Sequence, residues 1–263
     1  MKTVAIIQAR MGSTRLPGKI LKPILKKPML KHMLERVKRA KKIDAIIIAT
    51  TDAREDDVVV RLVERTEVGV FRGNEKDVLD RFYKAAQEVG ANIVVRLTGD
   101  CPLMDPEVID HVVSHFEEGG SAMDYCSTPR NYSEGLDIEV FSFVALEKAW
   151  KKARLPSERE HVTPYIKSHS ESFKIESWRE GEGNNSKMHW SVDTAEDFEF
   201  VTKIFEQLYP INPSFNKDDV LALLAEHPEY LDINKGGTGY EGFAKSLEED
   251  MIYKKINHGS KSK

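Results

Sequence analysis

Residues 4–19 read Val4-Ala5-Ile6-Ile7-Gln8-Ala9-Arg10-Met11-Gly12-Ser13-Thr14-Arg15-Leu16-Pro17-Gly18-Lys19. The opening run is apolar without polar alternation, which is typical of a strand buried on both faces in a parallel sheet. The residues after it combine small side chains, hydroxyls and the cations Arg10, Arg15 and Lys19, a combination that suits a polyphosphate. A polar surface loop with incidental charge is less favoured, because a loop of this length usually has a function.

Two common nucleotide-binding motifs do not describe this loop. Gly12 and Gly18 are separated by five residues, one more than in a P-loop, and Ile20 stands where a P-loop has its Mg²⁺-binding Ser or Thr. The loop also has no G-x-G-x-x-G pattern, which disfavours a nicotinamide cofactor.

Three further apolar runs of the same kind follow, at Ala45–Ala49, Val68–Phe71 and Ile93–Leu97. The segments between the runs have apolar residues at helical spacing and predict the helices Pro28–Lys42, Asp56–Arg65 and Lys76–Val89. Strands and helices alternating in this order predict an α/β fold with a parallel, doubly wound sheet.

The second half of the chain is more mixed, and it contains neither a repeat nor a second independent core. The expected strands cover residues 123–126, 136–141, 173–178 and 187–192, with a hairpin-like loop at 180–186. The expected helices cover residues 106–116, 143–154, 159–168, 194–209 and 218–225. We therefore expect one domain over residues 1–235, followed by a loosely held tail at 236–263.

The net charge of −4 conceals a strong asymmetry. Residues 1–42 contain thirteen Lys or Arg and one acidic residue, so they carry +12, and the other 221 residues carry −16. This asymmetry makes a nucleic-acid-binding protein a hypothesis to weigh. Three of the thirteen cations lie where a triphosphate would bind, and we expect the others on a solvated surface, so we predict no nucleic-acid partner.

The cysteine count and the hydropathy indicate the cellular compartment in which the protein is expected. Two cysteines in 263 residues do not make a disulfide framework, so a reducing compartment fits best. The apolar start is too short for a signal peptide, and no window approaches the roughly 20 apolar residues of a membrane span. We expect a soluble, cytoplasmic protein without a membrane partner.

Ligands of open α/β sheets bind at the carboxyl ends of the strands, and carboxylates follow two of the predicted strands. Asp100 comes after Thr98-Gly99, and Asp193 comes after the predicted strand 187–192. Mg²⁺ takes one or two carboxylates together with substrate phosphates, so both residues are candidate metal ligands. Asp193 is an equally good candidate for the N-cap of the following helix.

Several longer segments point to one known family. They are residues 8–19, 71–82, 96–103, 134–141, 159–163 and 192–197, and they resemble the cytidylyltransferases that make CMP-activated acidic sugars such as CMP-KDO and CMP-acylneuraminate. The closest resemblance is to the spore-coat polysaccharide cytidylyltransferase-like branch. It implies a Rossmann-like fold of the nucleotide-diphospho-sugar transferase type, with a small α+β insertion, at about 123–190, for dimer and acceptor contacts.

The same resemblance implies an activity and a set of site residues. The activity is Mg²⁺-dependent transfer of a nucleoside monophosphate from CTP to a sugar or sugar-acid acceptor, with release of pyrophosphate, by a homodimer. Arg15, Lys19 and Asp100 are the implied catalytic residues, Asp100 and Asp193 the metal ligands, and Glu139, Glu160 and His161 the acceptor contacts. The implied nucleotide-binding residues are Ala9, Arg10, Met11, Gly12, Ser13, Arg15, Lys19, Thr50, Asp52, Asp77, Arg81, Thr98 and Gly99.

Other enzymes stay open as alternatives. Related enzymes usually carry an acidic residue where this chain has Cys101, so the acceptor does not transfer with the resemblance. A guanylyl- or uridylyl-specific enzyme would keep the same phosphate loop. A glycosyltransferase that uses a nucleotide sugar is disfavoured, because Asp100-Cys101-Pro102 lacks the second aspartate of an Asp-x-Asp motif.

Overall fold

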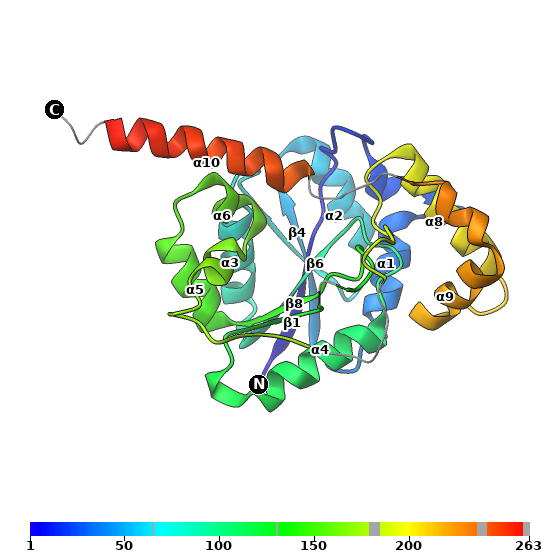
Figure 1. Cartoon of the computed structure of the whole chain (residues 1–263), viewed down its shortest axis with the longest axis horizontal. Coiled ribbons are helices and arrows are strands. Elements are labelled where there is room, and N and C mark those ends of the chain that lie inside the picture. The colour runs from blue at the N-terminus through cyan, green and yellow to red at the C-terminus, as the bar shows by residue number, and fades with distance from the viewer. Residues whose placement is uncertain (65, 130, 179–184, 236–240, 260–263) are drawn as a thin grey trace.

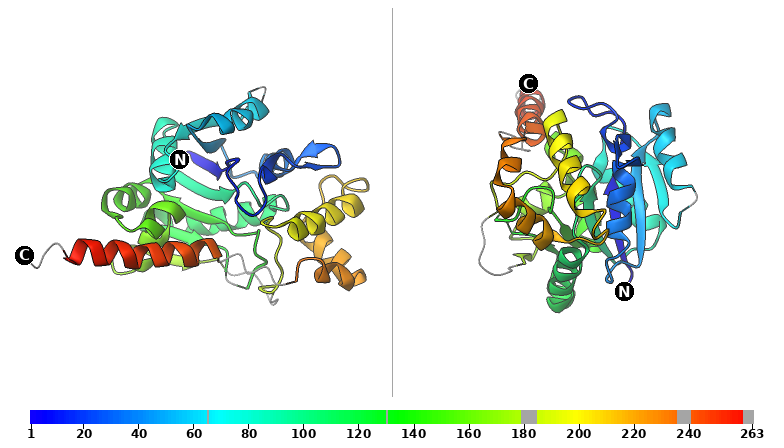
Figure 2. Two further views of the ribbon diagram at one scale, coloured as in Figure 1. Left: turned by 90° about the horizontal axis from the view of Figure 1, so that it is seen from above. Right: turned by 90° about the vertical axis from the view of Figure 1, so that its right-hand side faces the viewer.

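A seven-stranded sheet with helices on both faces forms the centre of the computed structural model (Figure 1 and Figure 2). The structure describes residues 1–64, 66–129, 131–178, 185–235 and 241–259. The strands are β1 (Thr3–Gln8), β4 (Ala45–Thr51), β5 (Gly69–Gly73), β6 (Ile93–Thr98), β7 (Tyr125–Ser127), β8 (Glu139–Ser142) and β9 (Ile175–Ser177). Their spatial order is β5-β4-β1-β6-β8-β7-β9, and β8 runs antiparallel to both neighbours. The predicted α/β class with a mostly parallel sheet is confirmed.

Helices cover both faces of this sheet. They are α1 (Met29–Val37), α2 (Asp57–Val63), α3 (Val78–Glu88), α4 (Pro106–Glu118), α5 (Phe143–Lys152), α6 (Pro156–His161), α7 (Pro164–Ser168), α8 (Ala195–Leu208), α9 (Lys217–Glu226) and α10 (Glu241–Gly259). Alternate strand residues point to opposite faces, so Ala5 and Ile7 pack into one core with α1, α4 and α8, and Val4 and Ile6 into the other with α3 and α5.

The order of the strands places the loops after β1 and β6 side by side. The chain runs from β1 outward through β4 and β5 and then returns to β6 on the other side of β1, so the winding reverses between β1 and β6. Gln8 pairs with Thr98, the last residue of β6. Gly99 is required here, because a Cβ on it would lie 2.9 Å from the Cβ of Ala9 and 3.0 Å from the Gln8 carbonyl oxygen. This edge is where α/β sheets bind ligands.

Two predicted elements are wrong in the second half. Residues 187–192 form no strand: His189 makes a single bridge to Glu134, and Val192 then donates to the carbonyl of Asp100. Because this segment pairs first with one loop and then with another, it does not form the continuous row of hydrogen bonds to a single neighbour that defines a strand. The predicted helix at 159–168 is interrupted, because Val162 has φ of 71° and Pro164 begins a new helix, α7.

Other boundaries differ less. The predicted helices 28–42, 56–65 and 76–89 are present as the shorter α1, α2 and α3, and the predicted strands 123–126, 136–141 and 173–178 overlap β7, β8 and β9. Arg65 and most of the predicted loop 180–186 lie outside the described residues. Within the described ranges, no helix combines the length and the apolar character needed to cross a membrane.

Residues 241–259 of the expected tail form the helix α10, and this helix contacts α6 through Ser246 and Asp250. Figure 1 shows that α10 runs past α6 and that its C-terminal end extends away from the body. Asp250 is buried and accepts hydrogen bonds from the Ser157 backbone nitrogen at 2.9 Å and the Ser157 hydroxyl at 2.6 Å. Ser246 is buried against α6 as well. The contact rests on polar residues, which a search for apolar periodicity does not detect.

Replacing Asp250 tests this attachment. In Asp250→Ala the buried Ser157 N–H loses its acceptor, which costs about 1–3 kcal/mol. We expect faster hydrogen exchange throughout α10 and unchanged exchange in β1, measured by mass spectrometry. Glu249→Ala removes an exposed carboxylate one residue away and is the control. Unchanged exchange in α10 of Asp250→Ala would contradict the attachment.

Candidate active site

Lys19 lies at the centre of the predicted site and joins its two aspartates. Its side chain is nearly buried, and its Nζ donates to Asp100 Oδ2 at 2.6 Å, to Asp193 Oδ1 at 3.0 Å and to the Val192 carbonyl oxygen at 2.7 Å. Gly18, with φ of 68°, precedes it in a left-handed conformation that favours glycine. The structure thus brings together three residues that lie up to 174 positions apart in the chain.

The charges of this cluster stabilise one another. Burial alone would lower the pKa of Lys19, but the carboxylates of Asp100 and Asp193 outweigh burial and raise it. Burial alone would raise the pKa of Asp100, but the Lys19 ammonium outweighs that effect and lowers it. The ammonium and the Asp100 carboxylate therefore both stay charged near neutral pH.

Asp193 is not the N-cap of α8. That position belongs to Thr194, whose hydroxyl accepts from the Asp197 backbone nitrogen at 3.3 Å. The Asp193 carboxylate is instead shared by Lys19 and by Arg15, whose Nη2 lies 2.9 Å from Asp193 Oδ1. The structure therefore contradicts the predicted capping role of Asp193. Its carboxylate lies instead beside the two cations Lys19 and Arg15.

The beginning of the loop after β1 is attached to the end of β4 by a residue that the sequence analysis missed. Asp56 is buried, and its Oδ1 accepts from the Met11 backbone nitrogen at 2.7 Å, while its other oxygen binds Thr51. Its position at the start of the predicted helix 56–65, shortly after the strand 45–49, was the available signal. Arg10 lies on the exposed side of this loop, and its Nη1 pairs with Glu75 at 2.6 Å. Gly12 packs so close that a Cβ would lie 2.6 Å from Arg10 Nη1.

The remaining predicted nucleotide residues are spread along the same sheet edge. Thr50 is fully buried at the end of β4, whereas Asp52 is exposed just beyond it. Thr98 contacts the Sγ of Cys101 at 3.1 Å. Burial and the neighbouring Asp100 raise the pKa of the Cys101 thiol well above its usual value, so it is protonated and a poor nucleophile.

Two of the predicted nucleotide residues, Asp77 and Arg81, are engaged within the protein. Asp77 caps α3 by accepting from the Asp80 backbone nitrogen at 2.9 Å, and it forms an ion pair with Arg159. Arg81 is buried, and its Nη1 donates to the carbonyl oxygens of Asn74 and Glu75.

The predicted acceptor residues form two internal networks. Glu139 is 7% exposed, and its carboxylate accepts from Arg96, Tyr125, Thr163 and Lys167 at 2.6–2.9 Å. Burial alone would raise the pKa of Glu139, but Arg96 and Lys167 outweigh it and lower the pKa strongly. Glu160 and His161 both contact the hydroxyl of Ser246 on α10, each at 3.0 Å.

A second charged network, which the sequence analysis also missed, holds the backbone of Asp193. His189 Nδ1 lies 2.7 Å from Glu134 Oε2, and His189 Nε2 lies 3.5 Å from Asp197 Oδ1. Asp197 Oδ2 in turn accepts from the backbone nitrogens of Asp193 and Thr194 at 3.0 and 2.8 Å. The histidine side chain is thus linked through Asp197 to the residue before α8.

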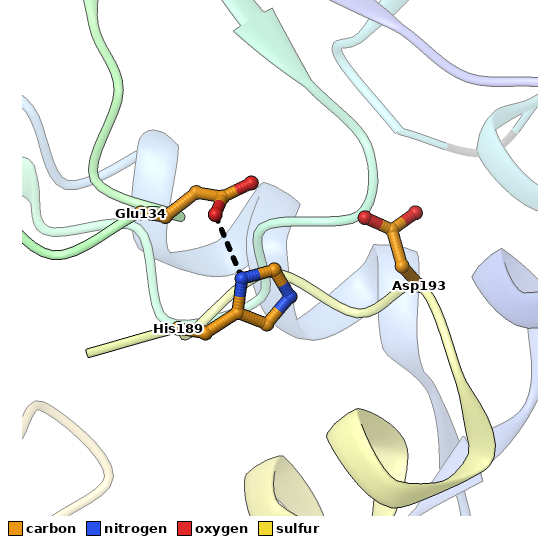
Figure 3. A group of neighbouring side chains, drawn as sticks. All are labelled: Glu134, His189 and Asp193. Carbon is orange, nitrogen blue, oxygen red and sulfur yellow. Dashed lines mark hydrogen bonds and ion pairs between the residues drawn. The ribbon is translucent and has the colours of Figure 1, made fainter. Parts of the chain in front are cut away.

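Glu134, His189 and Asp193 lie close enough together to resemble a metal site, with ligand atoms within 4.8 Å of one another. Figure 3 shows that His189 faces Glu134, with the Asp193 carboxylate to one side of the ring. Burial alone would lower the pKa of His189, but its contacts with Asp197 and Glu134 outweigh burial and raise it to about 10. In this arrangement His189 forms ion pairs with Glu134 and with Asp197.

The raised pKa of His189 predicts a pH-dependent contribution to stability. A pKa of about 10 in the folded chain, above the roughly 6.5 of an unfolded one, gives stabilisation that is complete below pH 6.5 and lost as pH rises through 10. We expect His189→Gln to lower the free energy of unfolding by about 2 kcal/mol at pH 6 and by progressively less toward pH 10.

Urea denaturation of wild type and variant at pH 6, 8 and 10 measures this difference. His227→Gln is the control, because the side chain of His227 is 42% exposed in its pair with Glu229. A His189→Gln deficit that stays constant across these pH values would contradict a protonated His189.

Comparison with known proteins identifies the family of this chain. A family model described as "Cytidylyltransferase" matches residues 4–252. An uncharacterized protein of Methanocaldococcus jannaschii is 41% identical over 239 residues, covering 89% of this chain and 95% of that protein. A spore coat polysaccharide biosynthesis protein of Bacillus subtilis is 32% identical over 235 residues, covering 85% of this chain and 94% of that protein.

A solved structure supports the same assignment. The structure of a cytidylyltransferase from Leptospira borgpetersenii serovar Hardjo-bovis superposes with a TM-score of 0.83 at 35% identity, covering 88% of this chain and 97% of that one. The family predicted from the sequence motifs is confirmed. The chain belongs to the cytidylyltransferase family and is a nucleotidyltransferase.

Proposed function

We propose that this protein transfers cytidine monophosphate from CTP to a hydroxyl group of a sugar or sugar acid, for polysaccharide biosynthesis. The acceptor oxygen forms a bond to the α-phosphorus, the bond from that phosphorus to the β-phosphate oxygen breaks, pyrophosphate leaves, and the hydroxyl proton passes to solvent. The observation that carries the proposal is the convergence of Lys19, Asp100 and Asp193 at the switch point of a cytidylyltransferase fold. The similarity to a polysaccharide biosynthesis protein supports the substrate class.

The loop after β1 would bind the triphosphate through its cations. The side chains of Arg10 and Arg15 are each 41% exposed at this loop, where a phosphate group could reach them. Lys19 lies deeper, next to Asp100, where it would stabilise the negative charge of the departing pyrophosphate. Holding both substrates at fixed positions would remove roughly 7–11 kcal/mol of the barrier.

The residues at this edge fit a magnesium ion. Asp100 Oδ2 and Asp193 Oδ1 already converge on one cation, the Lys19 ammonium, and carboxylate oxygens are the ligands that Mg²⁺ prefers. Asp100 and Asp193 would hold the ion, which would neutralise charge on the α-phosphate and be worth several kcal/mol.

The acceptor would lie beyond Arg96. Glu139 is enclosed by four donors, so we assign it to orienting Arg96 and Lys167 rather than to direct contact with the acceptor. Lys167 is about half exposed, and both cations suit an acidic sugar. Glu160 and His161 lie at the end of α6, where both contact Ser246 of α10. We also propose that the chain acts as a homodimer through residues 123–190, with the catalytic domain spanning residues 1–235.

A thermal-shift comparison of the four nucleoside triphosphates, each with Mg²⁺, tests the donor. We expect CTP to give the largest rise in melting temperature. A larger rise in melting temperature with GTP or UTP would show that the donor nucleotide is not CTP. A shift with finished nucleotide sugars but with none of the triphosphates would favour a glycosyltransferase.

Asp100→Asn tests the role of this carboxylate in turnover. With CTP, Mg²⁺ and a panel of sugar acids, we expect pyrophosphate release to fall by at least about 100-fold, the scale of losing one charge-stabilising group. Asp218→Asn, which changes an exposed carboxylate, should keep wild-type turnover. Near-normal turnover of Asp100→Asn with an unchanged fold would exclude Asp100 from the mechanism.

Lys19→Met tests whether ammonium and metal compete for the same carboxylates. Without nucleotide, we expect the variant to bind Mg²⁺ about tenfold more tightly than wild type, a difference of about 1.4 kcal/mol, because the buried positive charge is gone. Isothermal titration calorimetry measures this affinity, and the exposed Lys26→Met is the control. Equal or weaker Mg²⁺ binding by Lys19→Met would place the metal elsewhere.

A further inference from the structure

The second half of α10 leaves large apolar side chains exposed to water. Leu247 is 44% exposed, Met251 and Ile252 are each 58% exposed, Tyr253 is 37% exposed and Ile256 is 65% exposed. Figure 1 and the left-hand view of Figure 2 show the C-terminal end of α10 projecting beyond the body. Helical segments shorter than about 12 residues are marginal in water unless they pack against another element. A group of exposed apolar side chains on such a segment indicates an interaction surface.

The two faces of α10 are used differently. Ser246 and Asp250, four residues apart, are buried and bind α6, so they define the attached face. At 3.6 residues per turn, the face that points away from α6 contains positions separated by three, four and seven residues. This outer face consists of Glu248, Met251, Ile252 and Lys255, all of which are exposed.

The outer face is complementary to itself in charge. Residues 247–256 read Leu-Glu-Glu-Asp-Met-Ile-Tyr-Lys-Lys-Ile. Counted inward from the two ends of this segment, Glu248 corresponds to Lys255 and Met251 corresponds to Ile252, so an acid matches a base and an apolar residue matches an apolar one. Within the described ranges, neither Glu248 nor Lys255 forms an ion pair. Their charges are therefore available to a partner.

We propose that α10 binds the α10 of a second copy of this chain in an antiparallel pair. The twofold axis passes between Met251 and Ile252, so that these side chains of both copies pack together and leave water. Glu248 of each copy lies opposite Lys255 of the other, which gives two identical ion pairs, as an interface between equal surfaces requires. A parallel pair would instead place Glu248 opposite Glu248, where like charges repel.

A second copy fits this face better than a membrane surface does. Helices that lie on membranes gather their apolar side chains on one face and carry Lys and Arg on the other. Leu247 and Ile256 are nine residues apart, which is about two and a half turns, so they lie on opposite sides of α10. They flank the outer face on either side, where each borders the helix of the second copy.

The pairing is separate from the nucleotide site. None of the residues in the outer face belongs to that site, so the inference holds whether or not the proposed transfer reaction is correct. It is also separate from the proposed homodimer contacts at residues 123–190, because α10 begins at Glu241.

Charge reversal tests the pairing, with sedimentation velocity of the full chain over a range of concentrations as the measurement. We expect Glu248→Lys and Lys255→Glu each to raise the dissociation constant of the wild-type association at least about tenfold, because each places like charges opposite each other. An equimolar mixture of the two variants should associate like wild type, since every facing pair is again of opposite charge. All of these side chains are exposed, so the fold is preserved.

Glu249→Lys is the matched control. It makes the same charge change one residue along the chain, about 100° around the helix from Glu248, and should associate like wild type. Loss of association in Glu249→Lys as well, a mixture that stays dissociated, or a wild-type chain whose mass is unaffected by Glu248→Lys would each overturn the proposal. An interface at residues 123–190 alters none of these comparisons, because no variant lies in it.

Disulfide formation tests the antiparallel direction. In a mixture of Glu248→Cys and Lys255→Cys chains, one pair of facing positions holds two cysteines and the other keeps its ion pair. Under mild oxidation we expect a disulfide-linked dimer in the mixture and none in either variant alone. The chain's own Cys101 and Cys126 are buried and do not compete. Cross-linking of each variant with itself would show a parallel pair and overturn the proposed arrangement.

Discussion

The site depends on one buried ammonium group, that of Lys19. A lysine charge withdrawn from water is unfavourable unless acceptors surround it, and here Asp100, Asp193 and the carbonyl of Val192 do so. These acceptors come from the segment after β6 and the segment before α8. The charge of Lys19 therefore brings three distant segments to the same edge of the sheet, where the backbone bond from Val192 to Asp100 reinforces the arrangement.

The same arrangement prepares the chemistry that we propose. Two carboxylates that converge on an ammonium can converge on a divalent cation, provided that the ammonium finds another anionic partner. A triphosphate offers that partner to Lys19 and to Arg15, which also pairs with Asp193. The internal ion pairs of the free protein thus involve the same groups that substrate and metal would need.

Most of the other charged residues near the site serve the fold. Glu139 accepts from four donors that come from three different segments, and His189 with Asp197 holds the backbone on which Asp193 is placed. Such residues differ from Asp100 in their surroundings and not in their chemistry. Identifying them requires the contacts made in the folded chain, because an aspartate or glutamate at a strand end can either stabilise the fold or take part in the chemistry.

The sequence by itself determined the α/β class, the strands β1, β4, β5 and β6 and the family, because these depend on local patterns: apolar runs, helical spacing and contiguous motifs. It also singled out Asp100 and Asp193 as candidate metal ligands. Only the tertiary structure decided that Lys19 joins these two aspartates, that Thr194 and not Asp193 caps α8, and that α10 attaches to α6 through Ser246 and Asp250. Such contacts link residues tens to hundreds of positions apart, and the folded backbone, unlike any local pattern, sets which polar groups meet.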